Sequence, residues 1–325
     1  MTPQFVDFNF DGLQDMVIGT FEGTAFWVPG TAEGFQEFQR IKDAQGRPVL
    51  ISDFWNYEEK KWDEADRSPE GQENSSQHCT SVVAVDWDGD KDLDLLLGAY
   101  RAGALYLQLN DGKPGAPSYT GVNYPVKAGG SDLIVPGGMA SVRKVDWNDD
   151  GLFDLVCGGA KGGVYLYQNE GKLGSPEFAP PQSLVEPVGD DPAEIDNGLP
   201  TSPQTGFHID VVDFDGDEDL DLLVGGYSAW NPQQQELTPE QRIKVAELEK
   251  EISQLQVKFS TIRRDLQATV DKSDPQALRA AFKKFRESGD YQELRKRQLE
   301  AMAQLKKLKP TRQRKAFVWL YRQKP

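Results

Sequence analysis

Short apolar runs that end in glycine recur along this chain, each directly after a polar, aspartate-rich loop. They occupy residues 16–19, 95–98, 155–158 and 222–225. Their length and closing glycine predict buried β-strands. A second apolar run leads into three of the loops, at residues 81–86, 141–146 and 209–213. The pattern therefore predicts loops that join one strand to the next.

Further strands are predicted on the far side of each unit. After a short turn, an aromatic-rich run follows at residues 25–28, 104–107 and 163–167. A more irregular, proline-containing stretch supplies a fourth strand, as at residues 178–185. Successive loops begin 79, 60 and 67 residues apart. Four strands per repeat are typical of a β-propeller blade, so we expect an all-β fold with four recognisable blades.

The fourth unit is interrupted by a segment with helical periodicity. Its expected third strand, residues 316–321, comes only after a long insertion. The insertion opens with Thr238-Pro-Glu-Gln241, a capping box with proline at the first helical position. Apolar residues then alternate at spacings of three and four, which predicts a coiled-coil seam: Val245, Leu248, Ile252, Leu255, Phe259, Ile262 and Leu266.

A returning pair of helices completes the insertion. One is expected to start at Asp274-Pro275, and a break at Ser288-Gly-Asp separates it from residues 294–308. Because the chain must return to its blade, we expect an antiparallel helical hairpin. The predicted domains are propeller blades at 1–235, the hairpin at 236–315 and the last propeller strand at 316–325. That last blade stops after three strands, so we expect a partial propeller, completed by upstream blades or by another chain.

The polar loops repeat one nine-residue phrase four times, which points to a shared chemistry. Oxygen-bearing side chains occupy positions 1, 3, 5 and 9 of every copy: Asp7, Asn9, Asp11 and Asp15; Asp86, Asp88, Asp90 and Asp94; Asp146, Asn148, Asp150 and Asp154; Asp213, Asp215, Asp217 and Asp221. Calcium accepts roughly six to eight oxygen ligands in a flexible shell, and alternate residues of a tight loop can converge on one point. We therefore predict about four Ca²⁺ ions, one per loop. The alternative for any single loop is a plain Asp/Gly turn.

The loops begin like an EF-hand but continue differently. An EF-hand needs a glutamate at position 12 and a helix on each side. Position 12 here is apolar and lies in a predicted strand: Ile18, Leu97, Cys157 and Val224. Position 9 must therefore supply the closing carboxylate. By analogy with other calcium loops, position 7 is expected to ligate through its backbone carbonyl, so its side chain varies: Leu13, Asp92, Leu152 and Asp219.

The loops fall into two subtypes. Loops 1 and 3 have Gly12 and Gly151 at position 6, where a sharp turn favours positive φ. Loops 2 and 4 have Lys91 and Glu218 there, with the glycine moved to position 4. They gain a fourth carboxylate and carry backbone strain at position 6, of about 1 kcal/mol or more. The additional negative charge favours tighter calcium binding in loops 2 and 4, and the backbone strain opposes it. The sequence does not decide which of the two effects is larger.

Charge is distributed unevenly along the chain. The net charge is −16, yet residues 236–315 hold 20 Lys and Arg against 12 Asp and Glu. Much of the acidic excess lies in the loops, where bound metal would offset it. The acidic balance argues against a nucleic-acid partner, and no apolar run is long enough for a membrane span. Neither a secretory signal nor a disulfide framework is recognisable, because Cys79 and Cys157 fall in different repeats.

A polar excursion at residues 52–77 lengthens the interval between loops 1 and 2. It contains the aromatic residues Trp55, Tyr57 and Trp62. Such side chains on a surface loop can form a platform for a ligand, and they can equally pin the loop to its blade. We treat all three as candidate ligand contacts.

The four loops with their trailing strands, such as Asp94-Leu-Leu-Leu-Gly98, resemble FG-GAP/VCBS-type repeats. Repeats of this type also build the integrin alpha-chain propeller. The resemblance covers about residues 1–235 and 316–325, but Gly158-Gly-Ala and Gly225-Gly-Tyr replace the integrin form Phe-Gly…Gly-Ala-Pro. The chain is more similar to bacterial secreted versions. The resemblance implies calcium-binding blades and an extracytoplasmic setting, where millimolar calcium fills weak sites.

Two functions from different classes remain open on the sequence. The first is a non-catalytic binding or adhesion module for protein or carbohydrate, with the helical arm as a possible coiled-coil partner surface. The second is the propeller scaffold of a secreted carbohydrate-active enzyme of lyase or dehydratase type. We favour the first, because the aspartates are assigned to metal and no nucleophile–base pairing is recognisable. A third reading is a structural fragment of a larger protein.

Overall fold

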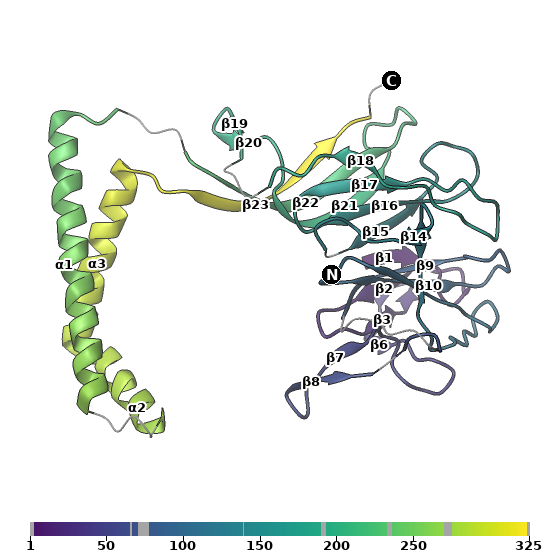
Figure 1. Ribbon diagram of the computed structural model, residues 1–325, viewed down its shortest axis with the longest axis horizontal. Helices are drawn as coiled ribbons and strands as arrows, with labels where there is room; N and C mark the ends of the chain where they lie inside the picture. The colour runs from purple at the N-terminus through teal and green to yellow at the C-terminus, as the bar shows by residue number, and fades with distance from the viewer. Residues whose placement is uncertain are drawn as a thin grey trace. The chain divides into compact units, whose positions relative to one another are not determined.

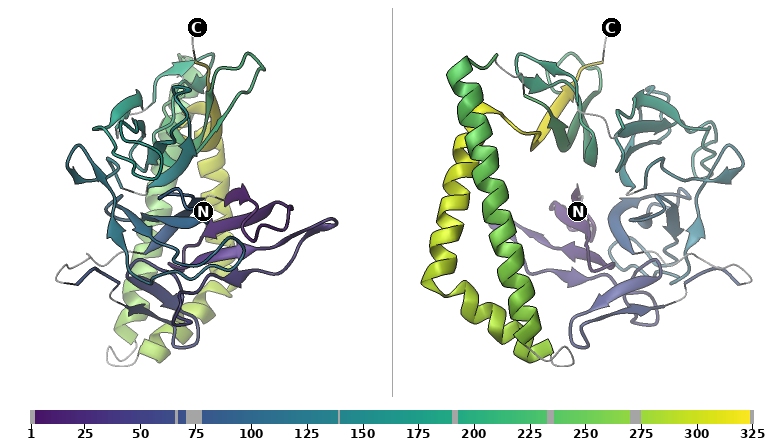
Figure 2. Two further views of the ribbon diagram at one scale, coloured as in Figure 1. Left: turned by 90° about the vertical axis from the view of Figure 1, so that its right-hand side faces the viewer. Right: turned by 60° about the vertical axis from the view of Figure 1, so that its left-hand side comes forward.

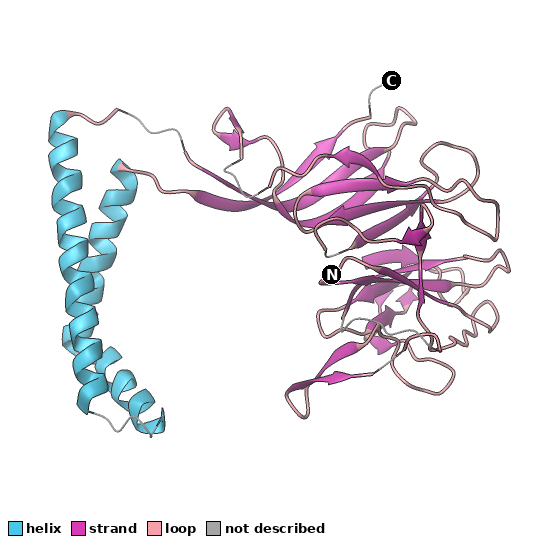
Figure 3. Cartoon of the chain, viewed as in Figure 1, coloured by secondary structure: helices cyan, strands magenta, loops and turns pink. Residues whose placement is uncertain are grey.

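The computed structural model describes residues 3–65, 67–70, 78–138, 140–189, 193–232, 236–269 and 275–323. The chain divides into two compact units, which we call the strand unit and the helical unit. The strand unit contains residues 1–229 and 314–325, and the helical unit contains residues 230–313. Figure 1 labels most of their elements, and Figure 3 separates strands from helices by colour.

Four antiparallel sheets, here called repeat sheets 1 to 4, form most of the strand unit. Repeat sheet 1 has the order β1 (Pro3–Val6), β2 (Asp15–Gly19), β3 (Ala25–Val28), β6 (Gln39–Arg40). Repeat sheet 2 has β9 (Cys79–Val85), β10 (Asp94–Ala99), β11 (Leu105–Gln108), β12 (Tyr124–Pro125). Repeat sheet 3 has β15 (Ser141–Val145), β16 (Asp154–Gly159), β17 (Gly163–Tyr167), β18 (Gln182–Val185). Repeat sheet 4 has β21 (Thr205–Val212), β22 (Asp221–Trp230), β23 (Gln313–Tyr321).

The strand unit also contains small two-stranded sheets. They pair β4 (Gly30–Thr31) with β5 (Gly34–Phe35), β7 (Asp53–Asn56) with β8 (Lys61–Glu64), β13 (Lys127–Ala128) with β14 (Ser131–Asp132), and β19 (Ile195–Asp196) with β20 (Leu199–Pro200). The β7–β8 hairpin holds the aromatic residues of the predicted excursion at 52–77. Residues 66 and 71–77 of that excursion lie outside the described part of the chain.

The expectation of a mostly β fold built from repeated strand–loop–strand units is confirmed. Each loop joins the first two strands of its sheet, as the pairing of Val6 with Asp15 across β1 and β2 illustrates. In chain order, α1, α2 and α3 come between β22 and β23 of repeat sheet 4. The arrangement of the repeat sheets as propeller blades stays a prediction.

The core of the strand unit lies between successive repeat sheets, which lie side by side (Figure 2). Val17 of sheet 1 and Val82 of sheet 2 belong to one buried cluster. Sheets 2 and 3 share a second cluster, and sheets 3 and 4 share a third. Strands alternate the faces to which their side chains point, so one sheet can pack on both of its neighbours. Cys79 and Cys157 are free thiols buried in these clusters.

The helical unit contains α1 (Pro239–Thr269), α2 (Pro275–Arg286) and α3 (Gly289–Leu308). The capping box is confirmed, since Thr238 N donates to Gln241 Oε1 at 2.9 Å and Gln241 N donates to Thr238 Oγ1 at 3.3 Å. Ser288 caps α3 by accepting from the backbone nitrogen of Tyr291. Asp274, expected at the start of the second helix, lies outside the described residues.

Helices α1 and α3 run antiparallel and pack on each other. Their contacts include ion pairs from Arg297 to Glu251 at 2.9 Å and from Lys309 to Glu249 at 3.0 Å. On α1 the predicted seam residues Val245, Leu248 and Leu255 are buried; on α3 Gln298 and Ala301 are buried. The coiled-coil geometry itself stays a prediction. Among the described residues, no helix is both long and apolar enough to cross a membrane.

Candidate metal-binding loops

All four nine-residue loops share positive φ angles at the same two positions. Positions 4 and 6 both have positive φ: 59° and 87° at Phe10 and Gly12, 85° and 76° at Gly89 and Lys91, 57° and 84° at Asp149 and Gly151, 79° and 72° at Gly216 and Glu218. In this backbone feature the two sequence subtypes therefore differ only in which of the two positions is glycine. Backbone strain was expected in loops 2 and 4 alone. The structure shows that each loop holds one non-glycine residue in the left-handed region.

The aspartate at position 1 holds the turn in place. Asp7 accepts hydrogen bonds from the backbone nitrogens of Asp11 at 3.0 Å and Gly12 at 2.9 Å. In loop 3, Asp146 makes the same two contacts, with Asp150 at 3.1 Å and Gly151 at 2.9 Å. These bonds satisfy amides that point into the loop, which is why a short acidic side chain suits this position.

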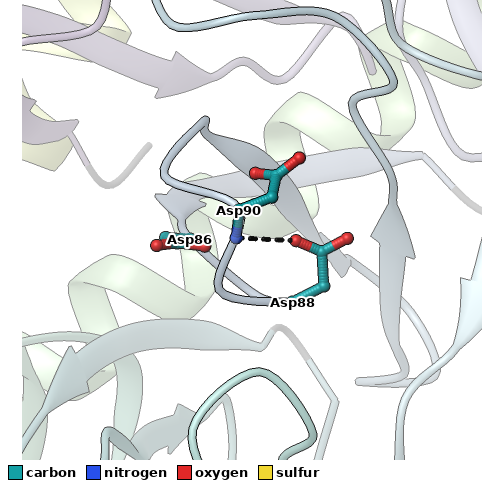
Figure 4. A group of neighbouring side chains, drawn as sticks. All are labelled: Asp86, Asp88 and Asp90. Carbon is teal, nitrogen blue, oxygen red and sulfur yellow. Dashed lines mark hydrogen bonds between the residues drawn. The ribbon is translucent and has the colours of Figure 1, made fainter.

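Carboxylates gather at positions 1, 3 and 5 in loops 2 and 4. In loop 2, ligand oxygens of Asp86, Asp88 and Asp90 all lie within 4.8 Å of one another (Figure 4). The equivalent group in loop 4 is Asp213, Asp215 and Asp217. Each group places three acidic side chains around one small volume. Oxygen donors that converge in this way are the ligands that hard cations prefer.

Loops 1 and 3 differ because asparagine stands at position 3. In loop 1, Asn9 Nδ2 donates to Asp11 Oδ2 at 2.8 Å, and its Oδ1 accepts from the backbone nitrogen of Asp11 at 3.0 Å. In loop 3, Asn148 Nδ2 donates to Asp150 Oδ2 at the same distance, 2.8 Å. The positions 3 and 5 are therefore adjacent in all four loops. In loop 1 the amide oxygen accepts one hydrogen bond and keeps a second lone pair for a cation.

The aspartate at position 9 does more than the sequence analysis assigned to it. In loop 2, one carboxylate oxygen of Asp94 accepts from the nitrogen of Trp87 at 3.0 Å and the other accepts from Asn110 at 2.8 Å. The same two-sided contact, to position 2 and to the end of the third strand, is made by Asp15, Asp154 and Asp221. All four side chains are buried. The expectation that position 9 closes a metal shell stays a prediction.

Asp92, at position 7 of loop 2, has an unusual environment. Its residue is 2% exposed, and neither carboxylate oxygen has a hydrogen-bond partner among the described residues. Burial and the neighbouring Asp90 carboxylate raise the pKa of Asp92 to about 7. Burial likewise raises the pKa of Asp94 to about 6, although the amides of Asn110 and Trp87 oppose the rise. A buried carboxylate without partners is costly unless a proton or a cation neutralises it.

The three aromatic candidates lie together on the β7–β8 hairpin, away from the nine-residue loops in sequence. Trp55 of β7 pairs across the hairpin with Trp62 of β8, with ring centroids 5.7 Å apart. Tyr57 follows β7 and is exposed. Together with Phe21 and Glu22, which the sequence analysis missed, they line one pocket.

Comparison with known proteins identifies the repeats. Residues 146–224, which span loops 3 and 4, match the family model described as the FG-GAP-like repeat. The resemblance drawn from the loops is thereby confirmed at the level of an FG-GAP-type repeat protein. No curated protein matches the chain.

One solved structure with a similar chain is the Photorhabdus luminescens Tc holotoxin pore. The sequence identity is 18%, and the similarity covers 69% of this chain and 11% of that chain, with a TM-score of 0.24. This chain thus spans about a tenth of its length. A TM-score this low carries no argument about fold or function.

A glycine turn within the FG-GAP-like repeat supports the loop of the preceding repeat. Gly174 has φ 74°, and a Cβ atom there would collide with the carbonyl oxygen of Asp88 in loop 2. Gly115 stands in the same relation to the carbonyl oxygen of Asn9 in loop 1, at 2.6 Å. The sequence analysis missed these turns. Their signal is the second repeated phrase Asn110-Asp-Gly-Lys-Pro-Gly115, which returns as Asn169-Glu-Gly-Lys-Leu-Gly174.

Proposed function

We propose that this chain is a calcium-binding, non-catalytic module that binds a protein or carbohydrate outside the cytoplasm. About four Ca²⁺ ions would bind, one in each nine-residue loop. The repeat sheets would act as propeller blades, stiffened by the metal and displaying the segments between them. The basic helical unit would offer a second surface, with the α1 seam available to a coiled-coil partner.

The observation that carries the calcium proposal is the charge arrangement of loop 2. Three carboxylates group at positions 1, 3 and 5, and the buried Asp92 carboxylate beside them lacks any partner in the described structure. Burial and like charge both disfavour ionised carboxylates there. A divalent cation would remove that penalty. The donor set consists of oxygen atoms in a short, irregular loop. Such a set suits Ca²⁺ better than Zn²⁺, which prefers softer nitrogen and sulfur ligands.

The loops would contribute ligands from a common pattern. Side-chain oxygens at positions 1, 3 and 5 would form most of the shell, with the backbone carbonyl at position 7. The carboxylate at position 9 would close the shell with a lone pair not used by the backbone amides. Because that carboxylate also holds the end of the third strand, metal and sheet would stabilise each other.

A binding role fits the acidic residues better than catalysis does. The aspartates of the four loops hold backbone amides or gather at the proposed metal positions. Acid–base catalysis needs a pair of titratable groups poised around an open site. The aromatic pocket on the β7–β8 hairpin has the composition of a ligand-contact surface instead.

Thermal unfolding of the purified chain with millimolar calcium and with chelator tests the proposal. We expect calcium to raise the unfolding midpoint by roughly 5 °C or more, and elemental analysis to find about four ions per chain. Asp90→Ala should lower the ion count, while Asp132→Ala, at an exposed acidic residue of β14, should not. An unchanged midpoint and no bound calcium would overturn the metal part. Turnover of a polysaccharide by the chain would overturn the non-catalytic part.

A further inference from the structure

The β7–β8 hairpin and the turn after β2 enclose a pocket whose lining is almost entirely aromatic. Its volume is about 330 Å³, and it is lined by Phe21, Glu22, Trp55, Tyr57 and Trp62. Phe21 is 57%, Tyr57 66% and Trp62 42% exposed. Leaving large aromatic surfaces in contact with water is unfavourable, and such patches mark sites where a ligand binds.

A set of packed aromatic rings around the buried His78 backs the pocket and fixes its walls. Trp62 packs on His78 at 4.9 Å between ring centroids, and His78 stacks on Tyr100 at 4.7 Å. Phe21 makes edge contacts with both His78 and Tyr100, at 5.4 and 5.3 Å. The ring of Trp55 meets that of Trp62 at 70°. The walls are therefore held by side chains from three separate parts of the chain.

The hairpin is also held to the rest of repeat 1 by its backbone. The Trp55 nitrogen donates to the carbonyl oxygen of Glu22 at 2.6 Å. The hairpin turn is tied by Asn56, whose Oδ1 accepts from the nitrogens of Glu58 and Glu59 at 3.0 and 3.1 Å. These contacts preform the pocket, so a ligand would lose little free energy in ordering it.

Among the described residues that line the pocket, Glu22 is the only charged one, and its charge is balanced by an ion pair. Arg40 pairs with Glu22 Oε1 at 2.9 Å, and Thr24 donates its hydroxyl to the same oxygen at 2.6 Å. Among the described residues, none donates to Oε2, which stays able to accept a hydrogen bond from a ligand. The paired guanidinium disfavours a cationic ligand, and the carboxylate disfavours an anionic one. The pocket therefore suits a neutral ligand.

The size and polarity of the pocket fit a sugar ring. The volume lies at the lower end of the range of small-molecule pockets, about 300–1,000 Å³. A pyranose ring has an apolar C–H face that stacks on an aromatic ring and a rim of hydroxyls that donate hydrogen bonds. We propose that this pocket binds one neutral sugar ring of a glycan, with Trp62 and Phe21 contacting its apolar face and Glu22 accepting from a hydroxyl. This inference rests on the proposed binding function and selects carbohydrate over protein as its ligand.

The experiment is a glycan array probed with the labelled full chain in calcium, followed by titration of hits with tryptophan fluorescence as the readout. We expect binding to glycans that present a neutral terminal hexose, and a change in indole emission as Trp62 is covered. Trp62→Ala and Glu22→Gln should each weaken binding by about tenfold or more. Tyr57 lies outside the paired strands of the hairpin, so Tyr57→Ala should leave the fold intact. This variant should also weaken glycan binding. Phe38→Ala, at an exposed aromatic outside the pocket, should bind as the parent chain does.

The outcomes separate this inference from the proposed function. Absence of binding to any neutral glycan by a folded, calcium-loaded chain would overturn the sugar site. So would sugar binding that is unchanged by Trp62→Ala, Tyr57→Ala and Glu22→Gln. A protein ligand captured through another surface would sustain the proposed binding function and overturn the sugar assignment. A chain that neither binds calcium nor changes its unfolding midpoint with calcium would instead count against the proposed function, whatever the array shows.

Discussion

The carboxylate of Asp94 accepts a hydrogen bond from the backbone nitrogen of Asn110 at 2.8 Å, although sixteen residues separate them. Its other oxygen holds the nitrogen of Trp87, so one side chain ties the loop to the end of the third strand. Asn110 continues the connection, because its Nδ2 donates to the carbonyl oxygen of Leu93 at 3.2 Å. The same arrangement joins Asp154 to Asn169 in the next repeat.

Replacing Asp94 by asparagine should therefore destabilise the chain even without calcium. The variant keeps one acceptor oxygen but turns an NH₂ group toward a backbone N–H, leaving both buried donors unsatisfied. We expect a loss of about 1–3 kcal/mol in the free energy of unfolding, measured in urea with chelator present. Asp88→Asn is the matched control at exposed position 3, where loops 1 and 3 already have asparagine, and it should change stability by less than about 0.5 kcal/mol. Equal effects of the two variants would contradict the structural role of position 9.

Lys91 has φ 76° at position 6 of loop 2, where loops 1 and 3 have glycine. Lys91→Gly should relieve the left-handed strain and raise the free energy of unfolding by about 1 kcal/mol, net of the entropy lost by glycine on folding. Lys91→Ala is the control, since it removes the same side chain and keeps the strain. The measurement is the free energy of unfolding of both variants, determined by denaturation with chelator present. Equal stability of the two would mean that the side chain, not the backbone, sets the effect.

Gly174 allows loop 2 to be perturbed without changing the side chain of a proposed ligand. A methyl group there would displace the carbonyl oxygen of Asp88, and the positive φ adds strain. Gly174→Ala should therefore weaken calcium binding at loop 2 by about tenfold or more, measured by calorimetric titration. Gly130→Ala is the control, because Gly130 has φ 80° with no atom within 4 Å of the added methyl. Loss of a calcium site in both variants would show a general effect of destabilisation instead.

His78 should make stability depend on pH. Burial lowers its pKa below the usual 6.5, Arg101 acts in the same direction, and Asp53 opposes them. The folded state therefore favours the neutral ring, and the unfolded state binds more protons as the pH falls below about 6.5. The stabilisation is complete above that pH and is lost progressively toward the folded-state pKa. In the His78→Gln variant, the unfolding midpoint should depend less on pH between pH 7 and pH 5 than it does in the parent chain. A parent and variant with parallel pH profiles would contradict this role.

The helical unit should be dispensable for folding of the strand unit. Among the described residues, the three apolar clusters between the repeat sheets contain no side chain of α1, α2 or α3. Replacing residues 237–312 by a short Gly/Ser turn should leave a β-rich chain that unfolds cooperatively, as circular dichroism can show. Loss of cooperative unfolding would place the helices in the folding core.

Local chemistry explains why much of this protein could be predicted from its sequence. The strand–loop–strand units follow from short apolar runs beside a repeated Asp/Gly phrase, because burial and turn formation act within a few residues. The capping box at Thr238 and Gln241 was predictable for the same reason, since both hydrogen bonds close over three residues. The match of residues 146–224 to the FG-GAP-like repeat model also rests on this contiguous pattern.

The tertiary structure decided what depends on residues that are distant in sequence. The role of Asp94 follows from its contact with Asn110, and the support for loop 2 comes from Gly174 in the following repeat. The aromatic pocket likewise needs Phe21 to meet Trp62, which no periodicity in either segment indicates. Side-chain patterns record which face of a strand is buried. Which partner covers that face, and which amide a buried carboxylate accepts from, is fixed only when the sheets pack.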